Sequence, residues 1–289
     1  MVVLAAAFSG GCGGSDASSR GTLDALLKRP GPDVSITAGA SEFVPGPVRY
    51  SFLVIRNDAR PVERRTASVW VAAGRGARPF ARVTARLEPI GIPGRSAPAF
   101  GAVSRIYVAH LHVPRPGRYW VVAEPNGAPI QAIGALEVVA HSPSPAVGTQ
   151  APRSVTPTLA DASAMSLTTR RPPDLGLLRY SVAASLAARR PFVVTFATPK
   201  FCTSRTCGPV VDIVDAVRKR FDSTPVRFIH VEVFRDNDPA KGYNRWMRQW
   251  GLQGEPWTFL VGRDGRVKAK FEGSVSEAEL AAAVRRTLL

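Results

Sequence analysis

The sequence predicts two domains, an all-β sandwich in the N-terminal half and an α/β domain in the C-terminal half. The 289 residues are enough for two ordinary domains, each with its own core. A hydrophobic share of 45% and a charged share of 21% are typical of globular proteins. Short β-branched runs between turn residues fill the first half, whereas strand-like and helix-like segments follow each other in the second.

The net charge of the chain is +16. A basic balance favours acidic partners such as nucleic acid or anionic lipid headgroups. Here the arginines are scattered through both halves and form neither a clustered tract nor a nucleic-acid-binding signature. We therefore expect no nucleic acid partner.

The first twelve residues resemble the signal of bacterial lipoproteins. An apolar stretch over 2–8 is followed by Ser9, Gly10 and Gly11 and then by Cys12, and small residues before such a cysteine resemble the lipobox of that family. The resemblance implies that Cys12 is acylated and ties the chain to the lipid bilayer. The alternative is a Gly-rich leader with a free thiol. The small and polar residues 13–32 are predicted to be a tether.

Residues 33–140 are predicted to form the β-sandwich. β-Branched and aromatic runs recur there between turn pairs such as Pro116-Gly117 and Asn126-Gly127. About seven short strands in about a hundred residues are typical of a sandwich. The segment HVPRPGRYWVVAEPNG at 112–127 resembles the penultimate hairpin of immunoglobulin-like modules, which implies an immunoglobulin-like sandwich. The predicted strands include 48–56, 68–73, 81–87, 104–113, 118–123 and 135–139.

This β domain offers little that points to chemistry. It contains no cysteine, and its best candidate metal ligands are His110 and His112. The two histidines share one face of a strand, but a metal site needs more ligands, so solvent-facing side chains are the favoured interpretation. We expect the domain to be a spacer or a binding module.

Residues 141–173 are rich in proline, serine and threonine and are predicted to be a linker. Within it, VGTQAP at 147–152 resembles the lead-in to the first strand of extracytoplasmic thioredoxin-like and peroxiredoxin proteins. The second domain, 174–289, follows and starts with a predicted helix over 181–189.

Cys202 and Cys207 lie between a predicted strand and a predicted helix. The run over 191–196 is apolar and suits a strand buried on both faces, and apolar residues recur with helical spacing over 210–221. A thiol at the start of a helix lies near the positive end of the helix dipole, so its pKa falls and its thiolate is favoured. Cys202 is the predicted nucleophile, and Cys207 is the predicted resolving thiol.

Four residues separate the two cysteines. Five steps along an ideal α-helix turn the chain by about 500°, so two side chains within one helix would diverge by roughly 140°. A disulfide needs the two Cα atoms within about 7 Å of each other. We therefore predict that Cys202 precedes the helix or that its first turn unwinds, which couples the redox state to local order.

The remaining segments follow an order that resembles thioredoxin. A strand is predicted over 226–234, and WGLQGEPWTFLV at 250–261 looks like the segment in which a loop presents a cis-proline ahead of an apolar strand. The resemblance runs from residue 146 to residue 289 and implies an α/β thioredoxin-like fold. It further implies that Glu255, Pro256 and Trp257 form a substrate-binding cis-proline loop beside the two cysteines.

This resemblance implies a thiol-disulfide oxidoreductase that uses no cofactor and no metal. With Cys12 acylated, the protein would be anchored to the cell membrane and act outside the cytoplasm, where disulfides persist. Its expected partners are protein dithiols and disulfides of the cell envelope, and a membrane thiol reductant or oxidant.

Three alternatives stay open. The C-x4-C spacing resembles that of the bacterioferritin-comigratory peroxiredoxins, which would make Cys202 peroxidatic, although Pro199 stands where that family has threonine. A copper chaperone would use the two cysteines and His230, which lies in an apolar strand. A non-enzymatic envelope lipoprotein would keep the cysteine pair as a staple and bind a partner through the immunoglobulin-like domain.

Overall fold

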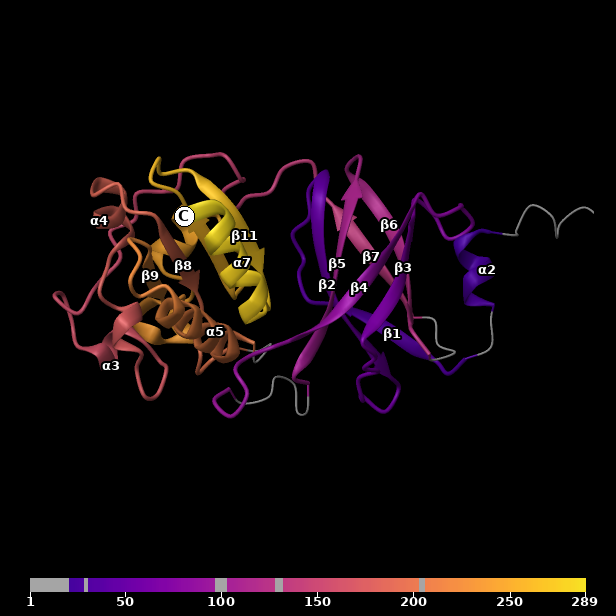
Figure 1. Cartoon of the computed structure of the whole chain (residues 1–289), viewed down its shortest axis with the longest axis horizontal. Coiled ribbons are helices and arrows are strands. Elements are labelled where there is room, and N and C mark those ends of the chain that lie inside the picture. The colour runs from indigo at the N-terminus through magenta and orange to yellow at the C-terminus, as the bar shows by residue number, and fades with distance from the viewer. Residues whose placement is uncertain (1–20, 29–30, 97–102, 128–131, 203–205) are drawn as a thin grey trace, which may run out of the picture.

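A computed structural model describes residues 21–28, 31–96, 103–127, 132–202 and 206–289 of the chain. These residues form two units, a β-barrel and a smaller sheet with its helices, which stand side by side in Figure 1. In the part of the chain that the structure describes, no helix combines the length and the apolar character needed to cross a membrane.

The first unit is a closed barrel with the strand order β1-β2-β5-β4-β3-β6-β7. Alternate side chains point inward and form its core, in which the rings of Tyr50, Phe52 and Tyr107 stack in a row. A short helix, α2 (Leu23–Leu27), packs outside the barrel at the end far from the second unit (Figure 1). The strands are β1 (Val34–Ala38), β2 (Gly46–Arg56), β3 (Thr66–Ala72), β4 (Ala81–Pro89), β5 (Arg105–Val113), β6 (Gly117–Pro125) and β7 (Ala132–Val138).

The predicted immunoglobulin-like sandwich is therefore wrong, although most of its strands are present. The strand β4 pairs with β3 over 81–86 and with β5 over 86–89, and β1 pairs with both β2 and β7. One continuous sheet thus closes on itself instead of forming two separate layers. The alternating pattern could not show this, because a sandwich and a barrel both place every second residue inside.

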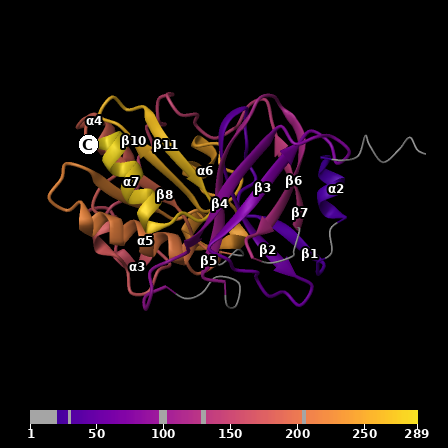
Figure 2. The same ribbon diagram turned by 45° about the vertical axis from the view of Figure 1, so that its right-hand side comes forward.

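The second unit is a four-stranded sheet with the order β11-β10-β8-β9. Only β8 and β9 run parallel, and the two central strands, β8 and β10, are buried along their whole length. Figure 2 shows α5 and α7 together on one side of this sheet, while α4 and α6 pack into the core on the other side. The strands are β8 (Phe192–Phe196), β9 (Arg227–Val231), β10 (Trp257–Val261) and β11 (Val267–Glu272), and these helices are α4 (Val182–Ala187), α5 (Cys207–Arg220), α6 (Arg245–Gln249) and α7 (Glu277–Leu288).

The predicted α/β thioredoxin-like fold class is also corrected by this architecture. The sheet is mixed, with a single parallel pair, and among the described residues only α5 and α7 are longer than two helical turns. The proline-rich stretch 141–173 contains the one-turn helix α3 (Ala164–Leu167), and the turn η1 (Leu175–Leu177) follows it. Between β9 and β10 lie the turns η2 (Arg235–Asn237) and η3 (Pro239–Lys241) and the short α6. Gly242, with a φ of 69°, ends η3 after one turn.

Polar contacts join the barrel directly to the second unit. The guanidinium of Arg49 on β2 donates two hydrogen bonds to the carboxylate of Glu279 on α7, at 2.8 and 2.9 Å. The carboxylate of Glu272, at the end of β11, accepts hydrogen bonds from the N–H groups of Ser41 and Glu42 at 3.0 and 2.7 Å. The barrel is therefore part of the surroundings of the second sheet and not a detached module.

Candidate redox site

Cys202 and Cys207 are joined by a disulfide where β8 gives way to α5. Cys202 lies in the loop before the helix and Cys207 is the first residue of the helix, so their Cα atoms are 6.0 Å apart. This arrangement confirms the prediction that Cys202 precedes the helix. Cys202 keeps 9% of its surface exposed and Cys207 none, so Cys202 is the more accessible residue of the pair.

The start of α5 is suited to hold negative charge on sulfur. Cys207 is the first residue of this helix, so it lies at the end where the first backbone N–H groups have no partner within the helix. The helix dipole adds a positive potential at this end. Lys200, whose ammonium lies 5.0 Å from the centre of the Phe201 ring, also belongs to the loop, while Arg205 falls outside the described residues. A thiolate formed here is stabilised.

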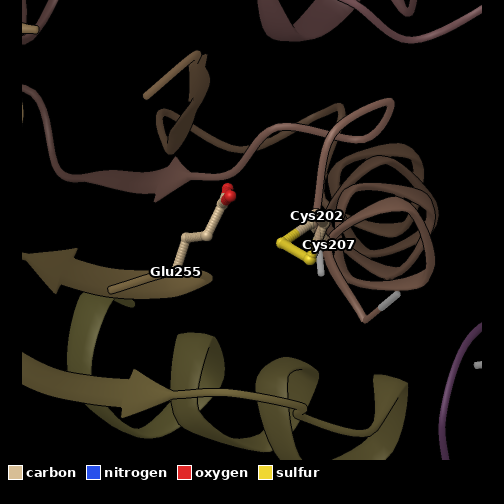
Figure 3. Close-up of side chains that lie close together, drawn as sticks. All are labelled: Cys202, Cys207 and Glu255. Carbon is tan, nitrogen blue, oxygen red and sulfur yellow. A yellow bond between two sulfur atoms is a disulfide. The ribbon is translucent and has the colours of Figure 1, made fainter. Parts of the chain in front are cut away.

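Glu255 is the acidic group of the site. Figure 3 shows its side chain extending toward the disulfide, and a carboxylate oxygen lies within 4.8 Å of both sulfurs. This carboxylate also accepts a hydrogen bond of 2.6 Å from the backbone N–H of Thr198. Burial, reinforced by the nearby charge of Glu232, raises the pKa of Glu255 to about 8 against the opposing effect of the Thr198 bond. Glu255 is therefore mostly protonated at neutral pH and can donate a proton.

A second buried acid, Glu232, lies behind the loop that carries Cys202. One of its carboxylate oxygens accepts hydrogen bonds from the backbone N–H and the hydroxyl of Thr169, at 2.6 and 2.8 Å. The same hydroxyl accepts a bond of 3.2 Å from the N–H of Lys200 and lies 3.5 Å from that of Thr198. These hydrogen bonds hold the loop that carries Cys202 in place. Sequence reasoning missed them because the residues that form them are far apart along the chain.

The three residues of the predicted cis-proline loop do not all lie at the site. The peptide bond between Glu255 and Pro256 is cis, as predicted, and both residues line a cavity that also includes Thr206, the neighbour of Cys207. Trp257 instead packs in the core on the other side of the sheet, stacked on Phe259 at 5.5 Å between ring centres. The structure thus brings Glu255 and Pro256 to the cysteine pair and directs Trp257 away from it.

The other residues singled out from the sequence lie elsewhere. Both ring nitrogens of His230 have protein partners, the carbonyl of Ala197 at 2.9 Å and the hydroxyl of Thr168 at 3.4 Å. His110 and His112 are exposed on β5. Among the described residues, the group that could hold a metal consists of Cys202, Cys207 and Glu255, and both sulfurs are committed to the disulfide in this state. Cys12, the predicted acylation site, falls outside the described residues.

The barrel reaches this site through the loop that follows β4. Ile92 packs against the apolar cluster that contains both cysteines. A few residues on, the hydroxyl of Ser96 donates a hydrogen bond of 2.6 Å to Asp212 on α5, and Arg95 bonds Asp215 at 2.9 Å. The helix that begins at Cys207 is therefore held by contacts from the barrel, and no local sequence pattern predicts these contacts.

No family model and no curated protein sequence matches the chain. Among solved structures, the chain is similar to a thiol:disulfide interchange protein of the thioredoxin family from Chlorobium tepidum TLS, with 18% sequence identity and a TM-score of 0.33. The match covers 52% of this chain and 100% of the other. At that TM-score the likeness supports no conclusion about mechanism, which must come from the geometry of the cysteine pair.

Proposed function

We propose that the chain is a thiol-disulfide oxidoreductase that reacts through Cys202 and Cys207. The observation that supports this most is the disulfide between a partly exposed loop cysteine and the first residue of a helix, with the carboxyl of Glu255 within 4.8 Å of both sulfurs. A bridge that closes so short a loop stabilises the fold by only about 2 kcal/mol through the unfolded chain, less than a bridge across a long loop. A purely structural role therefore explains the presence of these two cysteines less well than a redox role does.

The exchange proceeds in two steps. A substrate thiolate attacks Sγ of Cys202, the disulfide breaks, and its electron pair passes to Sγ of Cys207, where the start of α5 stabilises the charge and Glu255 can supply a proton. The second substrate thiol then attacks the substrate sulfur of the mixed disulfide and releases Cys202 as a thiolate. The substrate dithiol is oxidised to a disulfide while the cysteine pair is reduced, and the reverse sequence reduces a substrate disulfide.

We extend the proposal to the setting of the protein. The sequence around Cys12 supports acylation there and anchoring to the membrane on its extracytoplasmic side. In that setting the partners would be protein dithiols and disulfides of the cell envelope, and a membrane thiol reductant or oxidant would recycle the pair. Fatty-acid labelling that persists in the Cys12→Ser variant would contradict this part of the proposal.

The experiment that tests the activity is trapping of the mixed disulfide. In the full chain, Cys207→Ser leaves Cys202 without its resolving partner, so a substrate disulfide should form a stable adduct with Cys202. Cys202→Ser is the matched control and should form far less adduct because Cys207 is fully buried. Equal trapping by the two variants, or no adduct with either one, would contradict the proposed chemistry. Rapid turnover of hydroperoxide would instead favour a peroxidase.

A further inference from the structure

A cavity of about 160 Å³ lies between the barrel and the redox site. On the barrel side its wall is mainly apolar and includes Leu53, Ile90, Val103 and Ile106. These residues belong to an aliphatic cluster on the outer surface of the barrel, separate from the barrel core. The opposite wall is formed by Thr206, Glu255, Pro256 and the segment 272–274 at the end of β11.

The two walls are held at a fixed separation by a close approach of backbones. Gly273, at the end of β11, has a φ of 72°, and a Cβ there would lie 2.0 Å from the carbonyl oxygen of Gly39 in the barrel. The N–H of Gly273 donates a hydrogen bond of 2.9 Å to the carbonyl of Pro256. The barrel surface is therefore tied through one residue to the cis-proline, and the cavity is already formed in the oxidised protein.

We infer that this cavity is a specificity pocket that takes one aliphatic side chain of an extended polypeptide substrate, next to the cysteine that exchanges with Cys202. The inference rests on the proposed function. It assigns the barrel a direct part in substrate selection, which neither a spacer nor an independent binding module would have.

The size and lining of the cavity argue for this occupant. A water molecule occupies about 30 Å³ of liquid, so the cavity is on the scale of a single side chain and not of a folded surface. Apolar walls favour an aliphatic group by about 25 cal/mol for each Å² removed from water. The described lining residues include no basic side chain, and the carboxylate of Glu272 adds negative charge, joined by Glu255 only above about pH 8. A substrate with an acidic residue at this position is therefore disfavoured.

The test measures how fast a reduced peptide with two cysteines reduces the Cys202–Cys207 disulfide of the full chain. Two peptides differ only in the residue beside the reacting cysteine, which is leucine in one and aspartate in the other, and dithiothreitol serves as a dithiol without side chains. We expect the leucine peptide to react at least about 10-fold faster than the aspartate peptide.

Variants of Leu53, which lines the cavity from β2, link that preference to the pocket. Leu53→Trp should fill the cavity and abolish the preference for leucine while leaving the rate with dithiothreitol unchanged. Leu53→Ala enlarges the cavity and should shift the preference toward a phenylalanine peptide. This second variant tests the pocket even if Leu53→Trp folds poorly. Ile133→Trp is the control, because Ile133 packs near α2 at the far end of the barrel.

Equal rates for the leucine and aspartate peptides in the unmodified protein would overturn the pocket while leaving the exchange activity intact. A leucine preference that persists in Leu53→Trp would overturn it as well. Failure of every peptide and of dithiothreitol to reduce the disulfide would instead refute the proposed function, and the pocket with it.

Discussion

At the scale of single residues, the carboxyl of Glu255 decides how the site responds to pH. An ionised carboxylate next to the cysteines would raise the pKa of a thiol. In the structure the pKa of Glu255 is itself raised to about 8, first by burial and then by the charge of Glu232. The group is therefore neutral over most of the physiological range, and its negative charge opposes thiolate formation only above about pH 8.

Glu255→Gln should flatten the pH dependence of stability. The folded pKa of about 8 exceeds the ordinary value of 4.5, so the folded protein holds the extra proton between these values and becomes less stable as pH rises through that window. The glutamine variant lacks this proton equilibrium. We expect it to gain on the order of 3 kcal/mol relative to the unmodified protein between pH 5 and pH 8.

Chemical denaturation of the oxidised protein at several pH values measures this effect. Glu137→Gln, at an exposed position on β7, is the control and should leave the slope as it is. Parallel stability curves for the unmodified protein and Glu255→Gln would show that Glu255 does not bind the proton.

Sequence reasoning identified the residues of the site that are linked by local patterns. The order of a predicted strand, a predicted helix and a cis-proline segment was enough to identify four of them, which are Cys202, Cys207, Glu255 and Pro256. The contacts of Glu232 with Thr169 could not be predicted, because 63 positions separate the two residues and no local pattern pairs them. The direction of Trp257 was missed for a similar reason, since the face on which it lies depends on the register of β10 within the sheet.

At the scale of elements, the helix α5 is held by ion pairs to two aspartates in its second and third turns. Asp212 and Asp215 are almost fully buried on α5. Burial acts to raise the pKa of Asp215, but hydrogen bonds from Lys219, Arg95 and Arg218 outweigh it and lower that pKa. The stability that Asp215 contributes is thus present above its ordinary value of 3.8 and is lost as pH falls through the lower folded value.

Arg95→Ala should destabilise the protein by about 2 kcal/mol at neutral pH, because it leaves a buried carboxylate with fewer partners. Arg95 contacts Asp174, Asp212 and Asp215 together, and its loss also removes one of the contacts between the barrel loop and α5. Arg75→Ala is the matched control. Its pair with Asp24 lies on the surface and should cost less than about 1 kcal/mol. Equal costs in urea denaturation would contradict the role given to Arg95.

Most elements could be predicted from periodicity, and the fold classes could not. The strands β2 to β7 begin and end within a few residues of their predicted limits, whereas β1, a run of five residues with no strong alternation, was not among the predicted strands. That strand closes the barrel by pairing with β2 and β7. The architecture thus depends on pairing partners, which local patterns do not encode, and both predicted fold classes failed for that reason.

At the scale of the whole molecule, the barrel and the second unit form the two walls of one cavity. The sequence predicted two units but assigned no contact between them, since neither charge nor hydropathy marks the residues that meet. The units are joined in one place by the pairs Arg49–Glu279 and Ser41–Glu272. They are joined in another place by the pair Arg95–Asp215. If the cavity selects substrates, changes that separate the two units must alter reactivity without touching a cysteine.

Gly273→Ala tests this dependence. The added methyl group would meet the carbonyl of Gly39 at 2.0 Å, so the barrel must move away from Pro256 for the variant to fold. Gly127→Ala is the matched control, because Gly127 has a similar φ of 76° but open space around its Cα. The control should cost about 1 kcal/mol for the positive φ alone.

We expect Gly273→Ala to cost at least about 2 kcal/mol more than this control, since overpacking at a close contact adds to the backbone strain. It should also raise the radius of gyration in small-angle scattering and erase the preference for the leucine peptide, while the reaction with dithiothreitol continues. If the two alanine variants were equally stable and the leucine preference survived in both, the close approach of Gly39 and Gly273 would not be what sets the width of the cavity.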